Sequence, residues 1–191
     1  MDILQEQAIA YQKLMQYEYY FAVAYRTKTR AFILRFPIDN FLHLTGIHKL
    51  KDLSVHRMAS EKLFAKCLNG TLKYDDLKKS NSFDLIENRI CFVSKIEELL
   101  DSKHLVIICN GNFMRQYSKI PADYINEGMV DDRTFYLFLQ DYNKNKQKNI
   151  ETIDLQTIVY PISCFPKGKL DYKNNNMVAT ILVKEKRILN S

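Results

Sequence analysis

The spacing of apolar residues changes along the chain, and the change predicts the order of the elements. Up to about residue 101, apolar side chains recur mainly every three or four positions, which is typical of amphipathic helices. The helices expected from this spacing cover 2–17, 41–45 with Gly46 as exit residue, the stretch from Ser60 to Gly70, a turn at 74–80, and one long or two short helices over 82–101.

The segment between the first two helices is rich in Tyr, Phe and Val, which favour strands. It predicts a hairpin with strands at 18–26 and 31–36, although Ala22 and Ala24 leave open a first helix that runs on to about 24. Pro37 ends the second strand. Asp39 or Asn40 is the expected cap of the helix that follows.

Beyond residue 101 the apolar period becomes two, which predicts strands. They are expected at 104–109, 123–126, 134–142, 152–165 and 177–189, with a bulge or an edge at Pro161. Successive strands with short polar connections indicate an antiparallel meander. The absence of strand–helix alternation disfavours a doubly wound parallel sheet. The predicted fold class is therefore α+β, with N-terminal helices packed on a twisted antiparallel sheet, in one domain over 1–191.

Composition supports an ordinary globular domain, since 47% of the 191 residues are hydrophobic and 26% are charged. The chain contains no run of about twenty apolar residues, so no membrane helix is predicted, and the N-terminus lacks the pattern of a secretory signal. We therefore expect a cytoplasmic protein that does not bind a membrane. The four cysteines form no CxxC pair, and their apolar surroundings predict buried thiols.

The formal net charge of +6 is unevenly distributed. Basic residues dominate 26–66 and recur at Lys144, Lys146 and Lys148, whereas acidic residues gather in 75–101. A folded chain with one basic side would suit an anionic partner. The alternative is that these are solvated surface charges.

The segment 40–53 carries the strongest candidate chemistry. It holds His43, His48 and Lys49, and Gly46 would let both histidines point into a common space. An imidazole moves protons near neutral pH, and a lysine can hold a phosphate or stabilise an oxyanion. The alternatives are a core histidine at 43 and a solvated lysine at 49. A zinc site of both histidines and His56 would lack a recognisable further ligand.

Residues 36–53, FPIDNFLHLTGIHKLKDL, form the first of six sequence blocks that occur in a fixed order along the chain. The blocks that follow are KLFAKCLNGTL, SFDLIENRICFV, PADYI, TFYLFLQ and ISCF. Together they resemble the nuclease-like domains of phage polyvalent proteins and integrative elements, which are grouped with the barnase, EndoU, colicin and RelE nucleases. The resemblance covers about residues 18–185.

This resemblance implies a metal-independent, cofactor-free, toxin-like ribonuclease with a barnase- or RelE-like fold. Hydrolase chemistry would then use His43 as base or acid and His48 or Tyr124 as its counterpart. Lys49 and Arg89 would hold the phosphate, and Ser163 would hydrogen-bond it. For Arg89 the alternative is a salt bridge to Glu87 or Glu97; for Tyr124 and Ser163 it is a structural role.

A second hypothesis is a non-catalytic module of a mobile element that binds RNA, DNA or another protein. An antitoxin or immunity protein would add a partner to the nuclease without changing its chemistry. The two classes differ in geometry: catalysis requires His43, Lys49 and Arg89 in one cleft, whereas a binding module can carry them on different faces.

Overall fold

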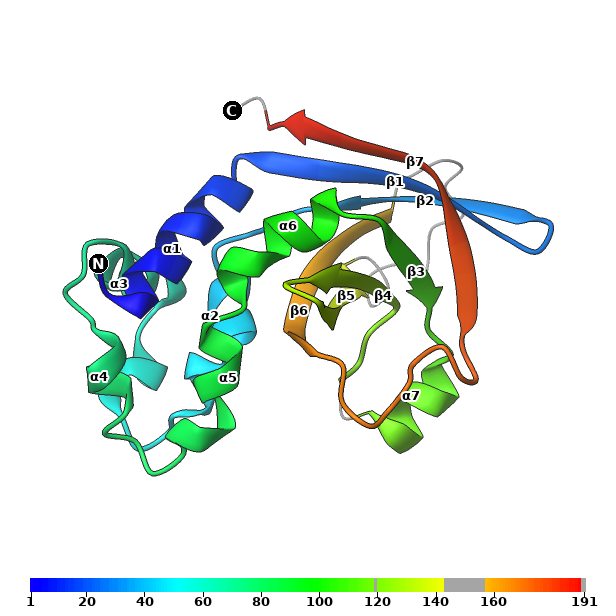
Figure 1. Ribbon diagram of the computed structural model, residues 1–191. Coiled ribbons are helices and arrows are strands. Elements are labelled where there is room, and N and C mark those ends of the chain that lie inside the picture. Colours follow the sequence, from blue (N-terminus) through cyan, green and yellow to red (C-terminus); the bar gives the residue numbers. More distant parts are fainter. Residues whose placement is uncertain (119, 143–156, 190–191) are drawn as a thin grey trace, which may run out of the picture.

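The computed structural model describes residues 1–118, 120–142 and 157–189, and Figure 1 shows their arrangement. The N-terminal half contains α1 (Ile3–Leu14), β1 (Tyr17–Tyr25), β2 (Lys28–Leu34), α2 (Asn40–Thr45), η1 (Ile47–Lys49), η2 (Ser54–Arg57), α3 (Ser60–Leu68), α4 (Tyr74–Leu77), η3 (Phe83–Leu85), α5 (Glu87–Ile90), η4 (Val93–Lys95) and α6 (Ile96–Asp101). The C-terminal half contains β3 (His104–Ile108), α7 (Gly111–Tyr117), β4 (Tyr124–Val130), β5 (Arg133–Asp141), β6 (Thr157–Pro166) and β7 (Met177–Ile188).

The first elements follow the predicted pattern. Helix α1 begins at Ile3, where the Asp2 side chain accepts a hydrogen bond from the Leu4 amide at 2.9 Å. The chain is extended over Tyr17–Tyr25 and again over Lys28–Leu34, so the hairpin is confirmed and the alternative of a helix reaching residue 24 is wrong. Aromatic and β-branched residues on a strand can pack against both neighbouring strands, which a longer helix would prevent.

The stretch 82–101 is more broken than the predicted one or two helices. It consists of η3, α5, η4 and α6, each only one or two turns long. The apolar spacing is still used, because Ile86, Ile90, Val93 and Ile96 are all buried. These β-branched residues lower helix propensity, which is consistent with tight turns in place of a continuous helix. Helix α7 was not predicted; it contains few apolar positions and is capped by Asn110.

The strands close into a barrel in the order β1-β2-β6-β5-β4-β3-β7, with β7 returning to β1. The predicted meander is correct for the successive pairs from β3 to β6 but wrong for the sheet as a whole. Strand β2 pairs in parallel with β6, where Ile33 faces Ile158, and β1 pairs with β7. These pairings join distant parts of the chain and remove the open edges that a meander would leave.

Alternate residues of β3, β4 and β5 enter two different cores. The larger core includes Tyr124 and Leu137 and continues under the N-terminal helices. The smaller core includes Tyr136 and Phe138 and is covered by α7 and Tyr172. Figure 1 shows α1 to α6 gathered on one side of the barrel, with α7 apart from them. The aromatic strand residues are therefore mainly core residues.

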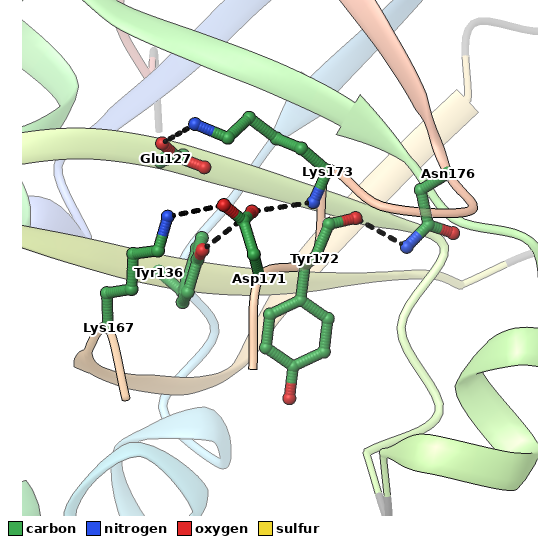
Figure 2. Close-up of polar contacts among 7 residues, drawn as sticks. All are labelled: Glu127, Tyr136, Lys167, Asp171, Tyr172, Lys173 and Asn176. Carbon is green, nitrogen blue, oxygen red and sulfur yellow. Dashed lines mark hydrogen bonds and ion pairs between the residues drawn. The ribbon is translucent and has the colours of Figure 1, made fainter. Parts of the chain in front are cut away.

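The connection between β6 and β7 is held by polar contacts within itself and by an ion pair to the barrel (Figure 2). Lys167 pairs with Asp171 at 2.7 Å, and Lys173 pairs with Glu127 of β4 at 3.0 Å. Asn176 donates to the Tyr172 carbonyl at 2.7 Å. These contacts hold Tyr172 over the smaller core.

Several remaining predictions have mixed outcomes. Cys67 and Cys164 are buried and Cys109 is partly buried, but Cys91 is exposed, which corrects the expectation for that thiol. Lys144, Lys146 and Lys148 lie outside the described residues, as does the start of the strand predicted at 152–165. Among the described helices, none has the length and apolar character needed to cross a membrane.

Candidate functional site

A cavity of about 640 Å³ lies where α2, η1 and α5 meet strands β5 and β6. Five of the six predicted site residues line it: His43, His48, Lys49, Arg89 and Ser163. The remaining wall comes from Asp39, Asn40, Ile120, Pro121, Gln140, Ile162 and Phe165. The fold therefore brings together side chains that the sequence spreads over more than a hundred positions.

Gly46 brings the two histidines together. It ends α2 with a φ of 79°, so that η1 starts in a new direction. A Cβ at this position would lie 2.8 Å from Cγ2 of Ile86, which leaves room only for glycine. The rings of His43 and His48 lie with their centroids 4.8 Å apart. The predicted short helix and the common orientation of the histidines are confirmed.

His48 is held in one orientation by a backbone contact. Its Nδ1 lies 2.9 Å from the carbonyl oxygen of Leu42. A carbonyl oxygen only accepts hydrogen bonds, so Nδ1 must carry the proton. In the neutral ring Nε2 is then an acceptor, and in the imidazolium it is a donor. Either form keeps the contact with Leu42.

His43 is exposed at the cavity, so it is not the core histidine considered as an alternative. Partial burial of the ring lowers its pKa, and the positive charges of His48 and Arg89 lower it further. The carboxylate of Asp39 acts in the opposite direction. Because the first three influences prevail, the neutral imidazole is favoured near neutral pH.

Arg89 joins the helical side of the cavity to the barrel. Its Nη2 donates to the His43 carbonyl oxygen at 2.8 Å and to the Ser163 hydroxyl at 2.9 Å. The predicted alternative of a salt bridge is wrong: no ion pair joins Arg89 to a described acidic residue. Glu97 pairs instead with Lys13 and Lys186.

The charge of Arg89 is consequently not balanced by a carboxylate of the described chain. Its Nε is buried and has no hydrogen-bond partner in the described structure. Burial lowers the pKa of this guanidinium, which nevertheless stays charged in proteins. Burial and the proximity of Arg89 also lower the pKa of Lys49. A partly buried guanidinium of this kind suits an anionic ligand.

A bulge in β6 places Ser163 beside Arg89. Phe138 pairs with Ser163 and Leu139 with Pro161, so Ile162 is the extra residue. Of the two possibilities predicted at Pro161, a bulge or an edge, the structure shows the bulge. Asn40 donates to the Pro161 carbonyl oxygen at 2.7 Å and thereby fastens α2 to the same bulge.

Tyr124 is the one predicted site residue that does not line the cavity. It is buried, and its ring stacks on Phe32 with the centroids 4.7 Å apart. Burial raises the pKa of its hydroxyl, and Arg30 opposes that rise. Strand alternation assigns Tyr124 to the larger core, a choice of face that the sequence pattern leaves open.

Asp39, Asn40 and Gln140 line the cavity but were not predicted as site residues. The sequence predicts Asp39 or Asn40 as the cap of α2; Asp39 occupies the cap position, but its side chain makes no capping hydrogen bond. Asp39 lies four positions before His43, the spacing that places two residues on one helix face. That spacing is the available sequence signal; Gln140 carries none.

Within the part of the chain that the structure describes, no three His, Cys, Asp or Glu side chains are grouped to hold a metal ion. His56 bonds to the Leu53 carbonyl oxygen through Nδ1 at 2.6 Å and does not line the cavity. The zinc site considered from the sequence is therefore not formed by the three histidines.

Comparison with known proteins adds one finding. A family described as phage-Barnase-EndoU-ColicinE5/D-RelE like nuclease4 has a model that matches residues 3–191. No curated protein and no solved structure matches the chain significantly.

Proposed function

The chain belongs to this family of phage-Barnase-EndoU-ColicinE5/D-RelE like nucleases, and from that premise we propose that it is a metal-independent endoribonuclease. The observation that carries the proposal is one cavity lined by two histidines, a lysine and an arginine. Acid–base groups beside cations are what phosphodiester cleavage needs when no metal ion supplies the charge.

His43 is the proposed general base. Its lowered pKa keeps the imidazole neutral, so it can take the proton of the ribose 2′-OH as that oxygen attacks the adjacent phosphorus. His48 is the proposed general acid. Its Nδ1 stays bonded to Leu42 while Nε2–H protonates the leaving 5′-oxygen. The O2′–P bond forms, the P–O5′ bond breaks, and the products are a 2′,3′-cyclic phosphate and a 5′-hydroxyl.

Arg89 and Lys49 are the proposed stabilisers of the negative charge that builds up on the phosphate oxygens. Arg89 is suited to this role because its contacts with His43 and Ser163 orient it before substrate binds. Ser163 acts in this scheme as a positioning residue through Arg89. Lys49 is exposed at the cavity and adds a second positive charge.

The test is RNA cleavage in the presence of EDTA by the wild type and by the variants His43→Ala, His48→Ala and His56→Ala. Loss of one acid or base is expected to lower the rate about 10²- to 10⁴-fold. His56 is a matched control, because its Nδ1 also bonds a backbone carbonyl but the residue does not line the cavity. Full activity in His43→Ala would contradict the proposed mechanism.

A nucleic-acid binding assay on the same proteins, beside the cleavage assay, separates the nuclease from the alternative function. Wild-type protein that cleaves nothing but binds RNA or DNA in a salt-dependent manner would be a nucleic-acid-binding module. Silence in both assays would point to a protein partner. Toxicity on cytoplasmic expression that His43→Ala relieves would support an antitoxin or immunity protein as the natural partner.

A further inference from the structure

A second cavity, of about 440 Å³, adjoins the first one. The two share three wall residues, Ile120, Pro121 and Gln140. The second cavity is lined by residues of α7, by Ser118, by residues 120–123 before β4, and by Gln140 of β5. A chain molecule bound in the first cavity can therefore continue into the second without leaving the surface.

The second cavity has both apolar and polar lining residues; the polar ones are Arg115, Ser118, Asp123 and Gln140. Met114 and Ala122 are buried, and the side chains of Ile120 and Pro121 add further apolar surface. Arg115 is exposed and donates to the Asn112 side chain, and no described ion pair engages it. Small-molecule sites combine apolar surface with a few polar groups, and apolar surface of this kind can pack against a flat heteroaromatic ring.

We infer that the second cavity binds the base of a nucleotide next to the scissile phosphate, and that the substrate is therefore single-stranded RNA. The inference rests on the proposed function. The shared wall carries it, because an endonuclease substrate extends beyond the bond that is cut. A base seated in a cavity has left its stack and its partner strand, which excludes a continuous duplex.

The first part of the test uses an oligodeoxynucleotide that contains a single ribonucleotide. Only that residue has a 2′-OH, so the scissile bond is fixed. Two further versions lack the base either at the ribonucleotide or at the residue after it. For the wild type, removal of one of these two bases is expected to lower kcat/KM about tenfold, because the contact of that base with the apolar cavity wall is lost.

The second part fills the cavity. Gly111 lines it, is exposed, and has open space where a Cβ would be placed. Gly168 offers the same open space in the β6–β7 connection, away from both cavities. Neither residue has a positive φ, so both accept a side chain without backbone strain.

On the intact substrate, Gly111→Trp is expected to have a kcat/KM about tenfold below that of the wild type. On the abasic version that the wild type cleaves about tenfold more slowly, the kcat/KM of Gly111→Trp should equal that of the wild type. Gly168→Trp should behave as the wild type. Equal activity of the two variants, or a duplex substrate cut as fast as the single strand, would overturn the inference while the proposed function stands. Failure of the wild type to cleave any substrate would overturn the proposed function and the inference with it.

Discussion

The guanidinium of Arg89 donates a hydrogen bond of 2.9 Å to the hydroxyl of Ser163, which lies 74 positions later in the chain. The same nitrogen donates to the His43 carbonyl oxygen, 46 positions earlier. One side chain from α5 thus connects the helix that carries His43 to the bulged strand of the barrel. We infer that this connection sets the distance between the proposed base and the proposed phosphate-binding cation.

Ser163→Ala is expected to lower kcat/KM about tenfold and the free energy of unfolding by about 1–2 kcal/mol, because Arg89 loses one of two oxygen partners. Ser80→Ala is the matched control. Ser80 is also buried and bonds Asp52, and neither residue lines the cavity, so its loss should affect stability but not cleavage. Urea denaturation and RNA cleavage measure the two effects. Equal cleavage by both variants would contradict a positioning role for Ser163.

The acid limb of the kcat/KM–pH profile is expected to have its midpoint below the usual histidine pKa of about 6.5. His43 must be neutral to act as base, and a lowered pKa keeps it neutral as the pH falls toward that midpoint. Arg89→Gln removes one of the charges that lower this pKa, so the pKa should rise. An NMR titration of the His43 ring measures it independently of activity. A pKa that is unchanged or lower in Arg89→Gln would contradict this account.

Tyr124→Phe is expected to leave kcat/KM within about twofold of the wild type. The hydroxyl belongs to the barrel core near Arg30 and does not line the cavity, so its removal takes nothing from the proposed reaction. Cleavage of the single-ribonucleotide substrate measures the effect. A loss of 10²-fold or more would instead identify Tyr124 as the acid that the sequence resemblance suggests.

Gly46→Ala is expected to destabilise the protein by more than the roughly 1–2 kcal/mol that a left-handed backbone costs an L-residue, because its Cβ would collide with Ile86. Gly70→Ala shares the positive φ, but the nearest atom belongs to the flexible Gln5 side chain at 3.4 Å. Gly70→Ala should therefore lower the free energy of unfolding only by the cost of the left-handed backbone conformation. Thermal or urea unfolding compares the two variants. Equal losses of unfolding free energy in the two variants would contradict a steric contribution from Ile86.

Much of the fold and part of the site could be predicted from neighbouring residues. The first helix, the hairpin of β1 and β2, and the meander from β3 to β6 depend on local spacing and propensity. His43, His48 and Lys49 lie within seven positions, so a short helix and one glycine already bring them together. A bulge or an edge at Pro161 was predictable because proline cannot donate to a strand ladder.

The tertiary structure decided the rest. Barrel closure depends on β1 meeting β7 and on β2 meeting β6, pairings between residues more than a hundred positions apart. Period-two alternation defines two faces of a strand but does not say which face meets the cavity, so it could not separate the core residue Tyr124 from the cavity residue Ser163. Arg89 likewise acquired its partners only in the folded chain, because burial of the whole core, rather than any local preference, places α5 against α2 and β6.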